Sequence, residues 1–371
     1  MGGFSNLLRM PGKIASLTGE VKSLKRELKA VRKENKQIKQ LLQSNLLTVQ
    51  SLGVAMAKRD DETVFDTRKR IMANVPPAAL STRMFQLAGL VLLNVLDDAC
   101  RENDIEYWLD FGALLGAIRH GKCIPWDDDI DVCMTRGEFN KLRKVFEGNE
   151  EFFVCELYSH TPTNSMNHVC QLKYLPTETQ ADLPCCLDIF IFDYVENADD
   201  LRATTKRIRD LRQEHRDAAW ELFRKLTDET GADEFSDTIQ GALKDFFEER
   251  LVQARSELNL GDDSGEGLVW AMDNYRLSKL TKYTHCRVDE VFPLVEIELE
   301  GRKYYSPKTY EARLQQQFDD YYAFPSNSAG HKHFSATDDV LYDVAKTIDR
   351  FADRYLQQID EGEIDLACSW L

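Results

Sequence analysis

The sequence has no pair of cysteines spaced as C-x-x-C, and its nine cysteines are scattered between Cys100 and Cys368. This spacing excludes the disulfide scaffold of a small secreted domain, and it predicts reduced thiols in a cytoplasmic protein. A zinc site that combines His168 with Cys170, Cys185 or Cys186 is an alternative use of these thiols.

Long apolar runs are also missing. The longest apolar segment, residues 87–96, is too short to span a bilayer and runs into Asp97 and Asp98. The opening residues, MGGFSNLLRM, have no apolar region long enough for a secretory signal. We therefore expect a cytoplasmic protein, with peripheral contact at the inner face of the membrane as a further expectation.

The sequence also has no excess of positive charge. The 371 residues include 47 Lys and Arg against 63 Asp and Glu, which gives a formal net charge of -16. A general nucleic-acid binder normally presents a basic face, so we expect no nucleic-acid partner. Because 43% of the residues are hydrophobic, the chain can bury a sizeable core.

Residues 1–60 differ from the rest of the chain. From Leu17 to Met56 apolar residues recur at three- and four-residue spacing, without proline, among basic and other polar residues. This pattern predicts a basic coiled-coil helix that forms a homo-oligomer through residues 14–57, with Asn35 as a buried polar residue that fixes the register. A single solvated helix is the alternative, and the positive charge also allows membrane-surface contact. A polar linker is expected over 61–80.

Helices and strands are mixed in the remaining chain without regular alternation. This order predicts an α+β fold with a mixed sheet flanked by helices. We expect one domain over 81–335 with a helical insert at 198–265 that breaks near Gly231 and Gly241, and a C-terminal helix and tail over 336–371. The predicted helices cover 81–103, 136–148, 308–322 and 337–361, and the predicted strands cover 152–158, 168–175, 187–195 and 288–306.

Four aspartates lie within five residues of an otherwise apolar segment, IPWDDDIDVCM: Asp127, Asp128, Asp129 and Asp131. Asp129 and Asp131 alternate with apolar residues, which predicts a strand with both carboxylates on one face. Neighbouring carboxylates repel each other, and a hard cation such as Mg²⁺ or Mn²⁺ would offset that repulsion. A solvated acidic turn is the alternative, but it does not explain the apolar flanks.

The preceding segment, YWLDFGALLGAIRHGKCIPW, offers glycine and positive charge. Gly112 and Gly116 predict a turn whose backbone amides approach a phosphate. Arg119 and His120 could bind phosphate oxygens, with a structural role or a role as general base as alternatives for His120. A third carboxylate, Asp188, lies inside the apolar run CCLDIFIFDYV, where packing alone does not explain it.

Together these blocks resemble the LicD family, which includes bacterial phosphocholine transferases and, more distantly, fukutin and fukutin-related protein. The resemblance extends over roughly 80–335 and is most specific over 106–136. It implies a nucleotidyltransferase-like fold in which Gly112 is the turn glycine, Asp129 and Asp131 bind metal, and Asp188 is the third acid. Many members have Ser or Thr at the position of Ala113, so one hydroxyl contact to phosphate is missing here.

The resemblance implies transfer of a phosphorylated alcohol, either phosphocholine or a phospho-polyol, from a CDP-activated donor. The acceptor would be a hydroxyl of a cell-surface glycan or its precursor, possibly one that is lipid-linked, and CMP would be released. Catalysis and metal binding are expected from Asp129, Asp131 and Asp188, and donor binding from Gly112, Ala113, Gly116, Arg119, His120 and Lys173. His331 and His333 are weaker candidates for phosphate or metal contact. The alternatives are transfer of a nucleoside monophosphate from a nucleoside triphosphate, and a non-catalytic coiled-coil scaffold.

Overall fold

The structure is a computed structural model that describes residues 10–78, 80–160, 166–174, 186–273, 284–325, 334 and 336–371. It divides into two units, which are described separately. The first consists of Met1–Arg68 with Phe324–Asn327, and the second of Lys69–Ala323 with Ser328–Leu371. His331, His333 and Cys185 lie outside the described residues.

The first unit is dominated by one continuous helix, α2 (Met10–Ala57), which confirms the predicted long N-terminal helix. Several of the apolar side chains that form the predicted coiled-coil stripe are at least half exposed in the single chain: Leu24, Leu28, Val31, Ile38, Leu42, Val49, Leu52 and Met56. Exposed apolar residues at this spacing are what a coiled-coil helix presents to a partner, so oligomerisation stays a prediction. The expected linker contains a further helix, α3 (Val64–Ala73).

The second unit is built on a mixed sheet with the strand order β1-β2-β5-β4-β3. The pair β2 and β5 is parallel, and the other neighbours in this order are antiparallel. The strands are β1 (Trp108–Leu109), β2 (Asp131–Thr135), β3 (Phe152–His160), β4 (Met166–Tyr174), β5 (Cys186–Val195), β6 (Leu260–Gly261), β7 (Gly267–Trp270) and β8 (His285–Arg287). The predicted α+β class is confirmed, and the strands predicted over 152–158, 168–175 and 187–195 correspond to β3, β4 and β5.

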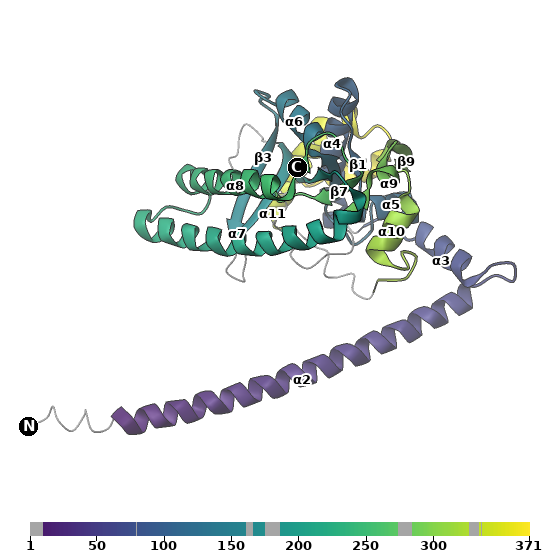
Figure 1. The fold of residues 1–371 in the computed structure, drawn as a ribbon. Helices are drawn as coiled ribbons and strands as arrows, with labels where there is room; N and C mark the ends of the chain where they lie inside the picture. Colours follow the sequence, from purple (N-terminus) through teal and green to yellow (C-terminus); the bar gives the residue numbers. More distant parts are fainter. Residues whose placement is uncertain are drawn as a thin grey trace, which may run out of the picture. The chain divides into compact units, whose positions relative to one another are not determined.

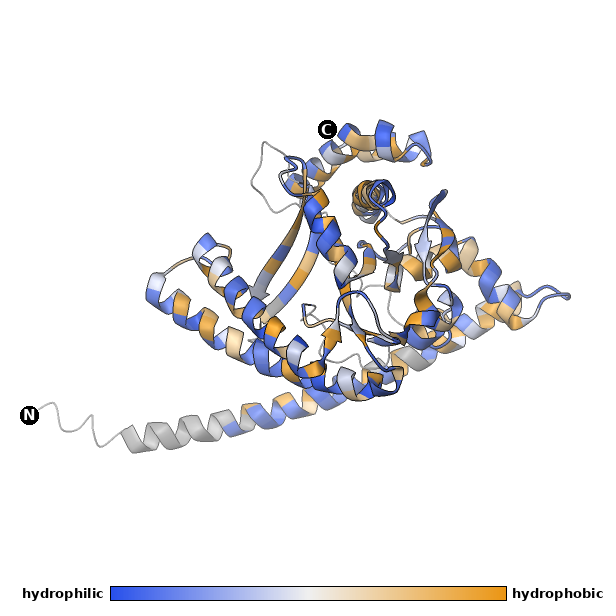
Figure 2. Cartoon of the chain, turned by 45° about the horizontal axis from the view of Figure 1, so that its top comes forward, coloured by the Kyte–Doolittle hydropathy of each residue, from blue (hydrophilic) through white to orange (hydrophobic). Residues whose placement is uncertain are grey.

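Two groups of helices cover the sheet. The apolar helix α4 (Leu80–Glu102) packs with α11 (Asp338–Tyr355) in the main core, and the predicted helix over 81–103 is thereby confirmed. The long helices α7 (Leu201–Thr230) and α8 (Asp237–Leu258) run side by side (Figure 1) and form a second core with the ends of β3 and β4. Hydrophobic and hydrophilic residues alternate along both of these helices (Figure 2), because each buries only one face.

The shorter elements complete the unit: α5 (Phe111–His120), α6 (Arg136–Val145), η1 (Ala198–Asp200), α9 (Val288–Val291), α10 (Tyr310–Phe318), α12 (Glu361–Cys368), and the hairpin of β9 (Val295–Leu299) and β10 (Arg302–Ser306). The predicted helices over 136–148 and 308–322 correspond to α6 and α10, and the predicted turn at Glu300 and Gly301 joins β9 to β10.

Three predicted boundaries are wrong. Gly231 ends α7, but Gly241 lies inside α8, where a glycine costs a helix only about 1 kcal/mol and packing compensates for it. Residues 288–291 form α9 rather than a strand. The predicted helix 337–361 ends at Tyr355 as α11, and a separate helix, α12, begins at Glu361. Among the helices described, none combines the length and apolar character needed to cross a membrane.

Candidate functional site

Two of the predicted site aspartates lie side by side on the parallel strands. Asp131 is the first residue of β2, and its register partner on β5 is Asp188. The backbone N–H of Asp188 donates to the carbonyl oxygen of Ile130 at 3.3 Å. Register partners project their side chains from the same face of a sheet, so the two carboxylates share one face. Asp188 therefore lies on a strand adjacent to Asp131, as expected, and its role as the third acid stays a prediction.

The acidic segment before β2 is not itself a strand, contrary to the predicted alternation from Asp129 onwards, because β2 begins at Asp131. Instead, the carboxylate oxygens of Asp127, Asp128 and Asp129 lie within 4.8 Å of one another. Asp128 is buried and accepts a hydrogen bond from the backbone N–H of Phe334 at 3.3 Å. Oxygen ligands from carboxylates are the donor set that hard divalent cations prefer, so these residues fit such an ion.

The predicted trio of Asp129, Asp131 and Asp188 does not form an equally tight group among the described side chains. Asp127 and Asp128 belong to the predicted acidic cluster, but no ligand role was predicted for them. The feature of the sequence that could have indicated a ligand role is their position directly beside Asp129.

The two glycines before this segment lie within helix α5 rather than in a turn, so the predicted glycine turn is wrong. A Cβ atom on Gly112 would lie 2.7 Å from Oδ2 of Asp127, and one on Gly116 would lie 2.7 Å from the carbonyl oxygen of Lys122. Glycine is needed at both positions because the helix packs directly against the acidic segment and the loop before it. Ala113 is buried in the main core.

The first turn of α5 is fixed by Asp110, which is fully buried. Its carboxylate accepts hydrogen bonds from the backbone N–H of Phe111 at 3.0 Å, from Nη2 of Arg313 at 2.7 Å and from Nε2 of Gln317 at 2.6 Å. Although burial alone would lower the pKa of Arg313, the charge of Asp110 holds that pKa above its ordinary value. Helix α10 is thus clamped to the N-terminus of α5 beside the acidic segment.

Sequence reasoning missed this clamp. The charged residue Asp110, framed by Leu109 and Phe111, was a visible signal, but nothing in the sequence pointed to its partners about 200 residues later.

Arg119 and His120 hydrogen-bond to each other inside the protein. Nε of Arg119 donates to Nε2 of His120 at 2.9 Å, and Nδ1 of His120 lies 2.6 Å from the carbonyl oxygen of Met72. Burial, reinforced by the charge of Arg119, lowers the pKa of His120 to about 4, and burial lowers the pKa of Arg119 to about 10. A neutral imidazole with both nitrogens engaged favours the structural role of His120 over the general base. Arg119 stays a predicted phosphate ligand, although its side chain is buried.

A glutamine on β4 orients Asp188. Gln171 is the register partner of Asp188, and its Nε2 donates to Oδ1 of Asp188 at 2.6 Å. Lys173 follows two residues later and pairs with Cys186, so its buried side chain projects from the same face of the sheet. Its predicted contact with phosphate is compatible with this position. Gln171 was not predicted, although CQLKY contains it two residues before Lys173.

A mixed sheet flanked by helices, with aspartates side by side on two parallel strands, agrees with the predicted nucleotidyltransferase-like fold. Residues 104–220 match the family described as LicD/FKTN/FKRP, nucleotidyltransferase domain. Over these residues the chain is therefore similar to the LicD/FKTN/FKRP family, in agreement with the resemblance found in the sequence. The match lies within the region over which that resemblance extends and includes its most specific part, 106–136.

Individual relatives support this assignment. The chain is 36% identical over 124 residues to the lipopolysaccharide cholinephosphotransferase LicD of Haemophilus influenzae, a match that covers 32% of this chain and 46% of that protein. It is 42% identical over 57 residues to the human ribitol 5-phosphate transferase FKRP, covering 15% and 10% of the two chains. An uncharacterized protein of Rickettsia typhi, RT0683, is 55% identical over 116 residues, covering 30% and 31%. The chain matches less than half the length of each of these relatives.

Proposed function

We propose that this protein is a phosphotransferase that moves a phosphorylated alcohol, phosphocholine or a phospho-polyol, from a CDP-activated donor to a hydroxyl group of a glycan. The observation that carries the proposal is the in-register pair Asp131 and Asp188 next to the carboxylates of residues 127–129. The family to which residues 104–220 belong, and the two named relatives that transfer phosphocholine and ribitol 5-phosphate, support the class of group transferred.

The donor set described above fits a divalent cation, which we propose is Mg²⁺ or Mn²⁺. Asp127, Asp128 and Asp129 would hold it, with Asp131 and Asp188 beside them. When bound, such an ion would neutralise negative charge on a diphosphate.

The chain's own side chains have separate roles in this proposal. The acceptor hydroxyl oxygen attacks the distal phosphorus of the donor, the bond from that phosphorus to the CMP oxygen breaks, and CMP leaves with the electron pair. Asp188, held in orientation by Gln171, accepts the proton of the hydroxyl. Lys173 binds phosphate oxygens from the neighbouring strand, and the α5 segment, including Gly112, positions the acidic residues.

We further propose that the predicted homo-oligomer forms through α2 with a second copy of the chain. The three- and four-residue spacing of its exposed apolar side chains carries this proposal. Sedimentation of the full chain should give a mass of at least two copies. Replacing Leu28 and Leu42 by Glu should reduce it to one, because buried like charges would repel, whereas a monomeric wild-type chain would contradict the proposal.

The function is tested by titrating CDP-choline, CDP-ribitol, CDP-glycerol and CTP calorimetrically into the full chain, with Mg²⁺ and with EDTA. We expect one CDP-alcohol to bind only with the metal present. The variant Asp129→Asn with Asp131→Asn should weaken binding by more than about 10–100-fold, since even indirect contacts to a metal contribute that much. The matched control, Asp228→Asn with Asp245→Asn, removes two exposed helical carboxylates and should bind as the wild type does.

The outcomes separate the alternatives. Release of CMP from the preferred donor supports the proposal. Preferential binding of CTP with release of pyrophosphate would instead indicate transfer of a nucleoside monophosphate. A folded chain that binds none of the four nucleotides would overturn the enzymatic function and favour the scaffold.

A further inference from the structure

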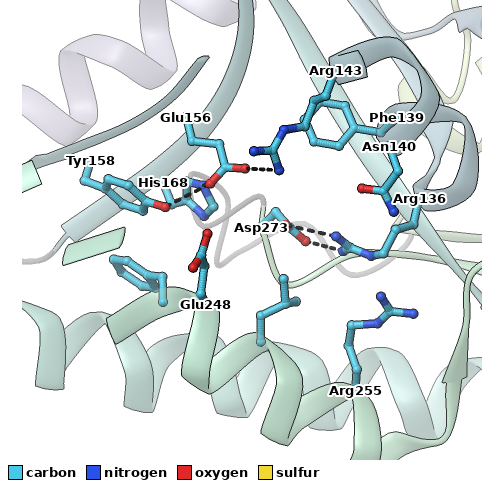
Figure 3. A pocket seen from close by; sticks show the side chains of 12 residues that line it. Arg136, Phe139, Asn140, Arg143, Glu156, Tyr158, His168, Glu248, Arg255 and Asp273 are labelled. Atoms are coloured by element: carbon cyan, nitrogen blue, oxygen red, sulfur yellow. Dashed lines mark hydrogen bonds and ion pairs between the residues drawn. The ribbon is translucent and has the colours of Figure 1, made fainter. Parts of the chain in front are cut away.

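A second polar site lies on the opposite face of the sheet from Asp188. On β4, Gln171 and Lys173 project toward the Asp188 face, so His168 and Cys170, at the alternate positions, project away from it. There a cavity of about 220 Å³ lies among β3, β4, α6 and α8 (Figure 3). The side chains around it are mostly charged or aromatic, and they include Glu156 and His168.

Three side chains with metal-binding atoms lie close together here, and two of them, Glu156 and His168, line the cavity. Oxygen of Glu156, nitrogen of His168 and sulfur of Cys170 all lie within 4.8 Å of one another. The sheet places them together, because Glu156 on β3 pairs in register with Cys170 on β4, and Tyr158 pairs with His168. Only 3% of His168 and 1% of Cys170 is exposed.

We propose that Glu156, His168 and Cys170 bind a zinc ion whose fourth coordination position faces the cavity. Zinc takes carboxylate, imidazole and thiolate ligands in tetrahedral sites, whereas the harder Mg²⁺ does not select thiolate. Bond lengths of about 2.0–2.3 Å place tetrahedral ligand atoms roughly 3.3–3.6 Å apart. The 3.6 Å between Oε2 of Glu156 and Nε2 of His168 already matches that separation.

Neighbouring side chains hold two of the ligands in place. The hydroxyl of Tyr158 donates to Oε2 of Glu156 at 3.0 Å, and Nη1 of Arg143 lies 3.3 Å from Oε1. The ring of His168 stacks on the ring of Tyr158 at a centroid distance of 4.5 Å. Figure 3 shows Glu156, His168 and Tyr158 close together, with Glu248 of α8 pointing toward them across the cavity. Contacts of this kind orient ligands and raise metal affinity.

The sequence already offered a zinc site that combines His168 with Cys170, Cys185 or Cys186. The structure joins His168 to Cys170. Cys186 lies on the other face of the sheet, where its sulfur accepts a hydrogen bond from Nε2 of Gln171 at 3.1 Å. A metal at Glu156, His168 and Cys170 would cross-link β3 to β4 and would be independent of the acidic segment.

Cobalt(II) is the probe that separates this site from the carboxylates of residues 127–129. The full chain is stripped of metal, titrated with Co²⁺ and followed by absorption. A thiolate ligand gives a near-ultraviolet charge-transfer band, and four-coordinate Co²⁺ gives intense visible bands, whereas an all-carboxylate site gives neither. We expect both signals at one Co²⁺ per chain, and we expect Zn²⁺ to displace them.

Variants then assign the ligands. Cys170→Ser should abolish the charge-transfer band, and His168→Gln should weaken Co²⁺ binding by at least about 100-fold, the upper end of what indirect contacts contribute. The matched control is Cys186→Ser, on the adjacent strand but the opposite face, which should leave the spectrum unchanged. The proposal is overturned if the folded wild-type chain shows no charge-transfer band, or if Cys186→Ser rather than Cys170→Ser removes it.

Discussion

The buried ion pair between Arg313 and Asp110 gives the most direct stability prediction. Only 5% of the Arg313 side chain and none of the Asp110 side chain is exposed. The guanidinium donates to Asp110 through both Nε and Nη2. Arg313→Met keeps most of the aliphatic stem but leaves the Asp110 carboxylate buried without its counter-charge.

Removing one partner of a buried pair costs about 3–5 kcal/mol, chiefly because the remaining charge is left uncompensated. Gln317 and the N–H of Phe111 still donate to Asp110 in the variant, so we expect a value near the lower limit, about 3 kcal/mol. The N-terminus of α5 should also loosen, and donor binding should weaken with it.

The assay is urea unfolding of the full chain, followed by circular dichroism. The matched control is Arg350→Met, which breaks the surface ion pair between Arg350 and Glu151. The two side chains of this pair are 51% and 43% exposed. Such surface pairs contribute about 0–1 kcal/mol. Adding Asp110→Asn to Arg313→Met should recover part of the loss, because it removes the uncompensated charge. The reasoning is refuted if Arg313→Met costs no more than the control does.

Three further predictions concern the site. Gly112→Ala should displace the Asp127 carboxylate packed against it and weaken metal-dependent donor binding in calorimetry. The control is Gly241→Ala, where the added Cβ meets open space. It should leave donor binding unchanged and stabilise α8 by up to about 1 kcal/mol. Burial lowers the pKa of His120 from 6.5 to about 4, so the unfolded chain binds this proton more tightly than the folded chain does. The free energy of unfolding should therefore fall by up to about 3 kcal/mol between pH 6.5 and pH 4 because of this residue. His120→Gln should abolish this contribution when unfolding is measured as a function of pH. Gln171→Met should leave the fold intact but reduce turnover about 10–100-fold by freeing the Asp188 carboxylate, and unchanged turnover would contradict its orienting role.

Sequence periodicity predicted the elements that carry their own pattern. The apolar run of α4 and the strands β3, β4 and β5 were located to within a few residues, because alternation and apolar continuity are local properties of the chain. The spacing of glycine was less informative. Gly112 and Gly116 were expected in a turn, but they lie in a helix, since a glycine that admits a close neighbour has the same appearance in sequence as one that bends the backbone.

The sequence by itself predicted the resemblance to the LicD family, the α+β class and the acidic residues of the candidate site, because a charged run inside an apolar segment is costly to bury and is visible without knowledge of the fold. Only the tertiary structure decided which partners those residues have. Gln171 meets Asp188 through strand register, Arg313 reaches Asp110 across about 200 residues, and Glu156 joins His168 and Cys170 on the reverse face of the sheet. Such contacts depend on how strands pair and helices pack, and no local pattern in the chain specifies them.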